Sequence, residues 1–434
     1  MKLHRSVLPV LSLALLIAAP PVTAQVTRTL RLELSAGESS QFAVENLAGS
    51  MKVRRGSGDA VVVIATVTAE SDELAQEVRL EKVRGAKGVP TLRVIYPLSS
   101  HRTLRYPGAP ERASGGGLWG RLFGGGDDGL RYGGTRANVS PSRGVLLYAD
   151  VEVQVPARSV QATFRNLVGP LEARELEGSL RFEVSSGNVT LAKLHGDIVA
   201  DTGTGNVEAS EIEGSIAGTT GGGDCELSVI RGEKVRCDTG SGDIRLRSVH
   251  VSGEIRADTG SGDVRARDLE GSFVCDTGSG DCDVEDLRGG NVNCDTGSGN
   301  VRLRRITAER IESDTGSGDV VAIGIDAQEF EADTDSGDVS VEVSGDRMLK
   351  IVAGTGSGNV RVRLNPDATF ELRANQGSGD LVCHYSDADP ILEKKEIVGY
   401  RRGDRRIRID VDTGSGSVTL EPSGEPRSAR NSRD

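Results

Sequence analysis

Apolar and polar residues alternate along most of this chain, a pattern that predicts strands rather than helices. Between residues 25 and 100 the alternation appears in Leu30-Arg31-Leu32-Glu33-Leu34, and residues 61–64 are apolar throughout. Successive strand residues point to opposite faces, so this stretch predicts several strands with one buried face. Residues 74–83 differ from the rest and predict one short helix.

From Val145 onward the alternation is arranged in units of similar length. In the unit 264–281, Val264, Ala266, Leu269, Phe273 and Cys275 are expected to point inward, and Arg265 and Arg267 outward. Each unit therefore predicts two short strands joined by two turns. Inward residues beside the turn are small, namely Ala200, Ala257, Cys275 and Ala332, as expected where two sheets converge.

Every unit ends in a turn with the motif Asp-Thr-Gly-Ser-Gly-Asp-Val or a close variant of it. The clearest copies occupy residues 238–244, 258–264, 276–282, 295–301 and 314–320, and copies from Asn188 to Asp380 are 18 to 21 residues apart. Repetition at a fixed period of this size is the signature of a stacked architecture. The turn chemistry needs no ligand, because the glycines can take positive φ and Asp or Asn can bond the backbone just downstream.

Two topologies fit these units: a β-solenoid with parallel stacking, or an antiparallel meander of hairpins. Identical turns at identical phase favour the solenoid, because equivalent positions then stack directly on one another. The sequence thus predicts an all-β fold, a repeat β-solenoid of about 19-residue rungs preceded by a small N-terminal β-region. About thirteen rungs would form a rod about 60 Å long.

The expected organisation has five parts. They are a signal peptide (1–24), an N-terminal β-region (25–106), a Gly-rich loop or linker (107–144), the solenoid (145–422) and a disordered tail (423–434). The first segment has Lys2 and Arg5, an apolar run and a small-residue cleavage site before Gln25, which predicts export. No later apolar stretch is long enough to span a bilayer. Residues 55–59, Arg-Gly-Ser-Gly-Asp, resemble an isolated copy of the repeat turn.

Composition narrows the range of functions. The chain has 57 glycines, 3% aromatic residues and a net charge of −12. So few aromatic residues suit a thin, layered β-structure, and the negative charge argues against nucleic acid as a partner. The Gly-rich loop contains the only Trp, and Leu118, Trp119 and Phe123 form a candidate partner contact there, although incidental apolar residues in a flexible loop are the favoured explanation.

Calcium is one alternative explanation of the repeated turns. The candidate ligands are Asp238, Asp243, Asp258, Asp263, Asp276 and Asp281, because Gly-rich, Asp-bearing β-roll repeats bind calcium in such turns. Those repeats recur at half this period, however, and Asn replaces Asp at several turns. No other cofactor is expected.

Enzymatic alternatives fit less well. Asp-Thr-Gly-Ser is also the catalytic loop of aspartic proteases, but that chemistry needs two facing carboxylates that share a proton rather than a row of turns. A glycan-cleaving β-helix needs clustered acid–base groups on long loops, whereas these turns are short and uniform. The sequence therefore predicts no catalytic residues.

All six cysteines lie within the repeats: Cys225, Cys237, Cys275, Cys282, Cys294 and Cys383. Cys275 and Cys294 occupy the same position one rung apart, within bridging range, and are a candidate disulfide. Cys282 lies across the turn from Cys275 and is a rival partner. Small buried thiols that fill a narrow core are a further explanation.

The Gly-Ser-Gly-Asp/Asn-Val repeats, together with the strand Asp-Val-Glu-Val-Gln-Val-Pro at residues 150–156, resemble the bacterial putative-adhesin family of repeat-rich β domains of unknown function. The resemblance covers about residues 30–420 and implies a non-enzymatic, exported β-solenoid, periplasmic or at the cell surface. Such a protein would serve as an adhesin-like surface or cell-envelope scaffold with a surface or envelope protein or glycan as partner. A periplasmic sensor or accessory protein in envelope stress, and a calcium-stabilised repeat protein, are the alternatives.

Overall fold

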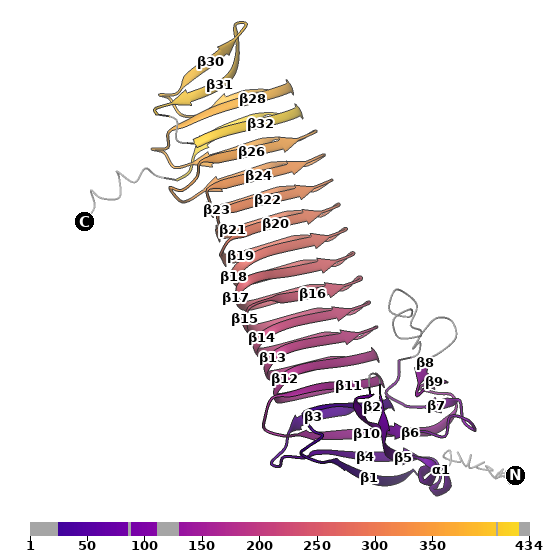
Figure 1. The fold of residues 1–434 in the computed structure, drawn as a ribbon. Helices are drawn as coiled ribbons and strands as arrows, with labels where there is room; N and C mark the ends of the chain where they lie inside the picture. Colours follow the sequence, from indigo (N-terminus) through magenta and orange to yellow (C-terminus); the bar gives the residue numbers. More distant parts are fainter. Residues whose placement is uncertain (1–24, 86–87, 111–129, 405–406, 425–434) are drawn as a thin grey trace, which may run out of the picture.

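The computed structural model describes residues 25–85, 88–110, 130–404 and 407–424. These residues form a long β-solenoid with a closing β-region at each end (Figure 1). The signal peptide predicted for residues 1–24 lies outside the described residues, as do Leu118, Trp119 and Phe123 and residues 425–434 of the predicted tail.

The N-terminal part of the fold contains eleven strands and a helix. They are β1 (Val26–Leu34), β2 (Gln41–Ala48), β3 (Met51–Arg55), β4 (Val61–Ala69), α1 (Asp72–Glu77), β5 (Arg79–Arg84), β6 (Pro90–Ile95), β7 (Thr103–Arg105), β8 (Leu130–Tyr132), β9 (Thr135–Ser140), β10 (Val145–Val155) and β11 (Val160–Val168).

The middle of the chain forms the stack. Its strands are β12 (Leu171–Ser186), β13 (Val189–Thr202), β14 (Val207–Thr220), β15 (Cys225–Gly232), β16 (Val235–Thr239), β17 (Ile244–Thr259), β18 (Val264–Thr277), β19 (Cys282–Arg288), β20 (Asn291–Thr296), β21 (Val301–Thr307), β22 (Arg310–Thr315), β23 (Val320–Asp326), β24 (Glu329–Thr334), β25 (Val339–Val343), β26 (Lys350–Thr355) and β27 (Val360–Leu364).

The C-terminal part supplies six more strands. They are β28 (Phe370–Ser378), β29 (Leu381–Cys383), β30 (Asp389–Glu393), β31 (Glu396–Arg402), β32 (Ile407–Ser415) and β33 (Val418–Pro422).

Each rung of the stack has two halves that belong to two facing parallel sheets. The leading sheet contains the half that follows each Gly-rich turn, for example Val264–Leu269, and the returning sheet contains the half that runs back to the next turn, for example Phe273–Thr277. The edge with the Gly-rich turns is called the Gly-turn edge, and the other the opposite edge. The solenoid has about eleven turns with rungs about 19 residues apart, so the predicted parallel stack is confirmed.

The core is the thin space between the two sheets. Inward positions are filled by small and branched apolar side chains, and Val264, Ala266, Leu269, Phe273 and Cys275 are all at most 4% exposed. Equivalent residues of successive rungs stack in direct register, as Ile255 does on Phe273 and Phe273 on Val292. Alternation along each strand thus buries one face and leaves the other to solvent, as the pattern predicted.

The N-terminal region is continuous with the stack rather than a separate unit. On the leading sheet, β3 pairs in parallel with β10 and β12, whereas β4 pairs antiparallel with β1 and β10. On the returning sheet, β2 pairs in parallel with β6 and β11, and β11 with β12. The antiparallel strands close this end of the rod, and β10 (Val145–Val155) belongs to this closure, so the regular rungs begin after β10 and not at residue 145 as the sequence predicted.

Three local predictions for the N-terminal part need correction. The predicted helix exists, but α1 spans Asp72–Glu77, and β5 follows it. Residues 130–140 of the predicted loop form the β8–β9 hairpin, which the Tyr132 hydroxyl anchors by donating to the carbonyl of Val94 at 2.6 Å. Residues 55–59 begin at the last residue of β3, where that strand reaches the opposite edge, so this Gly-Ser-Gly segment is not a copy of the stacked turn.

The C-terminal strands do not stack in chain order. The pair β32–β33 is inserted between the rung β26–β27 and the rung β28–β29: β26 pairs with β32, β32 with β28, β27 with β33 and β33 with β29. The β30–β31 hairpin then packs antiparallel on β28 and forms the end of the rod, at the yellow end of Figure 1. Residues 384–404 therefore form a closure instead of continuing the series of rungs.

The opposite edge contains a repeated feature that the sequence did not predict. One residue in each of nine successive rungs has a positive φ between 52° and 75°: Glu175, Lys193, Glu211, Val229, Ser248, Asp268, Asp286, Arg305 and Gly324. This left-handed residue turns the chain from the leading sheet toward the returning sheet. Left-handed backbone costs about 1 kcal/mol for an L-residue and most for a β-branched one.

We expect Val229→Gly to stabilise the protein by about 1 kcal/mol, because glycine removes the strain of a β-branched residue at φ 55°. Val229 is 47% exposed, so little packing is lost. The matched control is Ile323→Gly, which removes a side chain of similar exposure from the extended strand β23 and should lower stability. Urea unfolding of the three proteins checks this, and a Val229→Gly variant no more stable than the parent would contradict it.

Candidate functional site

The buried threonines of the Gly-turn edge tie each rung to the previous one. Ten Thr hydroxyls donate to the carbonyl of the second motif Gly in the neighbouring rung, as Thr259 does to Gly242 at 3.0 Å. The same oxygen accepts the N–H of the second Gly of its own turn, as Thr259 does from Gly262 at 3.1 Å. In seven of these ten turns, the Thr side chain thus satisfies two backbone groups of two different rungs.

The last Asp or Asn of each motif forms a second ladder. Its Oδ1 accepts the backbone N–H of the equivalent residue in the next rung, in ten successive bonds from Asn188 to Ser417. The sequence had suggested that this side chain bonds the backbone just downstream. It bonds the neighbouring rung instead. These bonds give the motif a structural role.

The motif glycines also differ from the prediction. Gly262 and its equivalents from Gly205 to Gly358 do not have the expected positive φ. They are required because a Cβ at Gly262 would collide with the carbonyl oxygen of Gly242 in the rung below. Close approach of the stacked turns, rather than backbone conformation, excludes larger residues.

The six calcium candidates are divided between two surfaces. Asp243, Asp263 and Asp281 belong to the Asx ladder, where Arg245, Arg265 and Arg302 pair with them. Asp238, Asp258 and Asp276 lie on the outer face of the returning sheet. Among the described residues, no group of three or more His, Cys, Asp or Glu side chains is placed to hold a metal. The geometry thus gives the calcium hypothesis no support, and it stays an untested prediction.

Six consecutive rungs of the returning sheet have an Asp at the same outward position. This aspartate column consists of Asp238, Asp258, Asp276, Asp295, Asp314 and Asp333. In the first two rungs an arginine two residues earlier pairs with the column, as Arg256 does with Asp258 at 2.8 Å. In the next four rungs that earlier position holds Val274, Asn293, Glu312 or Glu331.

The close carboxylates of the column change its titration. Partial burial raises the pKa of Asp314, and the neighbouring charges of Asp295 and Asp333 raise it further. Burial likewise raises the pKa of Asp238, with a contribution from Asp258. In the Asx ladder, burial alone would raise the pKa of Asp281, but the Asn300 N–H and the Arg302 guanidinium hold it below its usual value. The two stacks of carboxylates therefore have opposite electrostatic character.

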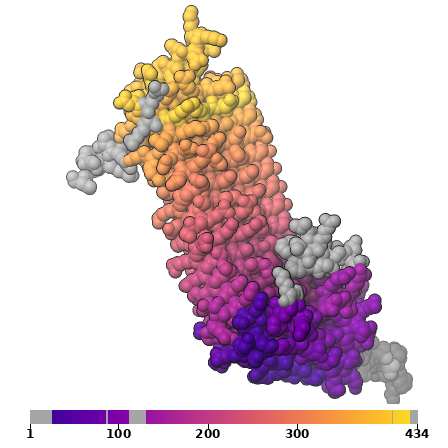
Figure 2. Space-filling view, in the orientation of Figure 1, coloured from indigo at the N-terminus to yellow at the C-terminus, as the bar shows by residue number. Residues whose placement is uncertain are grey.

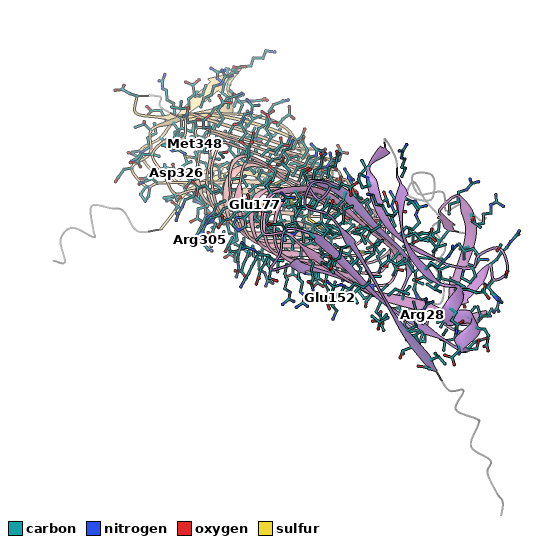
Figure 3. All side chains as sticks on the ribbon, turned by 60° about the horizontal axis from the view of Figure 1, so that its bottom comes forward. Arg28, Glu152, Glu177, Arg305, Asp326 and Met348 are labelled. Atoms are coloured by element: carbon teal, nitrogen blue, oxygen red, sulfur yellow. A yellow bond between two sulfur atoms is a disulfide. The ribbon has the colours of Figure 1, made fainter. Side chains whose placement is uncertain are left out.

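The outer face of the leading sheet has a different surface, which we call the arginine hollow. Six arginines line it, with Asp283 and Glu285 between them: Arg245, Arg247, Arg265, Arg267, Arg302 and Arg304. It spans four rungs and has a volume of about 600 Å³. The long side chains stand on β17, β18 and β21, and the shorter carboxylates of β19 form the floor. The side-chain view shows side chains all along the rod, with Arg305, the residue after Arg304, labelled (Figure 3).

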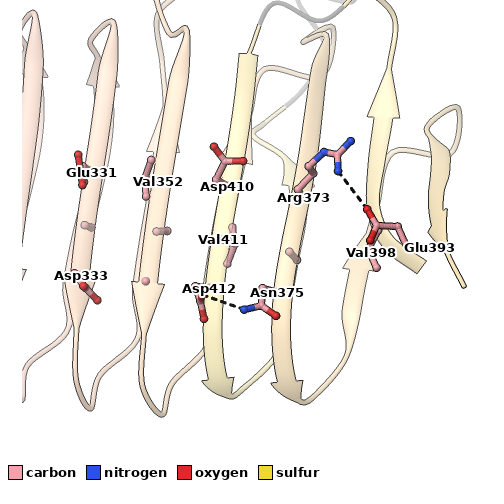
Figure 4. Close-up of a pocket in the computed structure, with 14 residues that line it drawn as sticks. Glu331, Asp333, Val352, Arg373, Asn375, Glu393, Val398, Asp410, Val411 and Asp412 are labelled. Carbon is pink, nitrogen blue, oxygen red and sulfur yellow. Dashed lines mark hydrogen bonds and ion pairs between the residues drawn. The ribbon is translucent and has the colours of Figure 1, made fainter. Parts of the chain in front are cut away.

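A second hollow, of about 540 Å³, lies near the C-terminal end (Figure 4). Gly354 takes the place of the next Asp of the column, between Asp333 and Asp412, which leaves the space open. On the far side, Arg373 pairs with Glu393 of the terminal hairpin at 3.4 Å. Five of the six charged residues that line this hollow are acidic, so its charge continues that of the aspartate column.

The cysteines pair across the core and not along the stack. Disulfides join Cys225 to Cys237 and Cys275 to Cys282, with Cα–Cα distances of 6.2 and 6.8 Å. Cys275 thus pairs with the rival partner, and the candidate bridge Cys275–Cys294 is wrong. Cys294 does stack on Cys275, but it remains a free, fully buried thiol whose pKa burial raises to about 12. Each disulfide links the two sheets beside the Gly-turn edge.

The described residues contain no helix with the length and apolar character needed to cross a membrane. Their histidines are dispersed: His195 lies 3.0 Å from Glu213 and is exposed, whereas His250 lies 3.3 Å from Asp268 and is half-buried. The sequence predicted that Arg265 and Arg267 point outward, but not that arginines surround a hollow. The repeated Arg-x-Arg at residues 245–247, 265–267 and 302–304 was the available signal.

Comparison with known proteins agrees with this geometry. A family model described as Toastrack DUF4097 matches residues 148–285 and 254–421. The chain belongs to this family. The match covers the stack and both of its charged faces.

Two solved structures match this Toastrack chain. One is a putative cell adhesion protein from Clostridium sporogenes, with 9% identity and a TM-score of 0.19, covering 92% of this chain and 100% of that one. The other is a putative lipid binding protein from Parabacteroides distasonis, with 13% identity and a TM-score of 0.23, covering 90% and 96%. No curated protein matches the chain.

We expect Thr296→Val to lower the free energy of unfolding by about 2 kcal/mol, because it leaves a buried N–H and a buried carbonyl without partners at nearly constant volume. Thr296 is 1% exposed, donates to Gly280 at 2.9 Å and accepts from Gly299 at 3.0 Å. Urea unfolding measures the change. Two control variants are Thr296→Ser, which keeps the hydroxyl, and Thr307→Val, which changes a Thr at the opposite edge. Both should lower the free energy of unfolding much less. Equal losses in all three variants would refute the role of the Thr ladder.

We expect Asp314→Asn to raise the melting temperature at pH 7, because it removes a carboxylate whose ionisation its neighbours oppose. A carboxyl whose pKa is raised in the folded state lowers the free energy of unfolding at neutral pH, where it is ionised. This loss disappears as the pH falls through that pKa and the group is protonated. The difference between variant and parent should therefore shrink on acidification. Asp281→Asn is the control with the opposite sign: its lowered pKa stabilises the fold at neutral pH, and this contribution disappears as the pH falls. Melting curves from pH 7 to 3 that are parallel for all three proteins would contradict the assignment.

Proposed function

We propose that this protein is a non-enzymatic, exported rod that presents its long faces for adhesion at the cell surface or for scaffolding in the cell envelope. The observation that supports this proposal best is the continuous stack of hydrogen-bonded turns, which occupies the repeated Thr and Asx side chains in holding rungs together. The residues most suggestive of chemistry in the sequence are therefore committed to structure, and the charged outer faces remain for recognition.

The shape of the molecule supports the same proposal. Figure 2 shows one long side of the rod as a continuous ridged surface from the indigo end to the yellow end. A rod of stacked rungs gains length without needing a larger core, because each rung is stabilised by its neighbours. Such a body suits a protein that extends between surfaces or displays a repeated face. The two disulfides suit an oxidising compartment outside the cytoplasm.

The proposal is tested by protease accessibility on producing cells in three states: intact, with the outer envelope permeabilised, and fully lysed. Digestion on intact cells places the rod outside and supports adhesion. Protection that ends on permeabilisation places it in the periplasm, which supports the envelope scaffold and keeps the envelope-stress accessory role as its alternative. Protection until complete lysis would overturn the proposal, because the protein would then be cytoplasmic. A periplasmic marker protein and a cytoplasmic one serve as controls for each state.

A further inference from the structure

We propose that the arginine hollow binds a short anionic segment of an acidic polysaccharide. This inference rests on the proposed export of the rod, because it requires the leading sheet to face an envelope or extracellular glycan. The partner is defined by its chemistry: an extended polymer with repeated carboxylate or sulfate groups. Arginine is well suited to such groups, because its planar guanidinium can donate two parallel N–H bonds to one anion.

The first row of arginines, nearest the Gly-turn edge, is fixed in place by the Asx ladder. Arg245 pairs with Asp224 at 3.0 Å and with Asp243 at 2.7 Å, and Arg265 pairs with Asp263 at 2.7 Å. Arg302 pairs with Asp281. These ladder carboxylates each accept a backbone N–H as well, so they cannot turn away. The first row therefore forms one neutral, ordered wall of the hollow.

The second row has uncompensated positive charge. It consists of Arg247, Arg267, Glu285 and Arg304 on four successive rungs. Arg267 pairs with Glu285, whereas neither Arg247 nor Arg304 has a carboxylate partner within the described part of the chain. Both side chains are exposed. At the spacing of adjacent strands, the two unpaired arginines are about 14 Å apart, with the hollow between them.

The surroundings of the hollow favour a narrow ligand over a broad surface. On one side the next rung has Glu226 and Ser228 at the equivalent positions, and on the other it has Val321 and Ile323. An anionic membrane would meet many rungs at once, including these acidic and apolar ones. A single polymer chain can stay within the four rungs of the hollow, where the guanidinium groups of Arg247 and Arg304 can bind its anionic groups.

The aspartate column restricts polyanion binding to one face of the rod. It lies on the returning sheet, so the two outer faces of the same rungs have opposite charge character. With a net charge of −12, the whole molecule repels polyanions at long range. Binding of a polyanion therefore requires a local site and should weaken with rising salt, because salt screens exposed charge pairs.

The test uses the purified full chain with its disulfides intact and a fluorescently labelled oligogalacturonate, a polymer of carboxylate sugars, in anisotropy titrations. The hollow variant is Arg247→Ser with Arg304→Ser. The matched control is Arg55→Ser with Arg174→Ser, which removes two exposed arginines at the N-terminal end and changes the net charge by the same amount. We expect the hollow variant to bind at least about tenfold more weakly and the control to bind like the parent.

Several outcomes would overturn the inference. No binding of oligogalacturonate or dextran sulfate by the parent protein would do so, and so would equal losses in both double variants, which would show non-specific charge attraction. Equal binding of neutral dextran would exclude recognition of anionic groups. Loss of binding to phosphatidylglycerol vesicles in the hollow variant, with polymer binding unchanged, would assign the hollow to lipid phosphate instead. These results leave the location experiment unaffected, so the failure of this inference and that of the proposed function are distinguishable.

Discussion

The hydrogen bonds between stacked Gly-rich turns are the interaction on which the rest of this structure depends. Parallel stacking brings the turn backbones so close that glycine is required at Gly262 and its equivalents. That proximity lets one Thr hydroxyl serve two rungs and one Asx oxygen reach the next. The turns therefore fix the register of both sheets, because every rung must align its turn with the one below.

A rod held together at its edge and in its core leaves the outer faces free to vary. Positions in one column lie about 4.8 Å apart, so any charge that recurs in the repeat is concentrated into a line. On the returning sheet this produces the aspartate column, whose carboxylates oppose each other's ionisation. On the leading sheet the alternation of arginine rungs with one acidic rung produces the arginine hollow. A charged residue that recurs at one position of the repeat thus gives each outer face a charge character of its own.

The ends of the stack are a separate physical problem, because a terminal rung presents unpaired backbone groups that invite association with other strands. At the N-terminal end, antiparallel strands β1 and β4 extend the leading sheet beyond the regular rungs. At the C-terminal end, the β30–β31 hairpin covers β28, and β32–β33 is inserted one rung below the end. Strand β28 is thereby enclosed between β31 and β32, which both follow it in the chain. This arrangement closes the end without a separate capping domain.

The sequence by itself determined the rung. Inward positions such as Val264 and Phe273, the two strands per unit and the parallel stack follow from alternation and from a fixed period, which are local properties of the chain. It did not determine which distant segments become neighbours. The insertion of β32 and the anchoring of Tyr132 both depend on such contacts. The left-handed residue of each rung belongs to the same class, because Glu175, Val229 and Arg305 share no side-chain chemistry. Only the tertiary stack imposes that conformation, since each rung must turn at the same point as the rung beneath it.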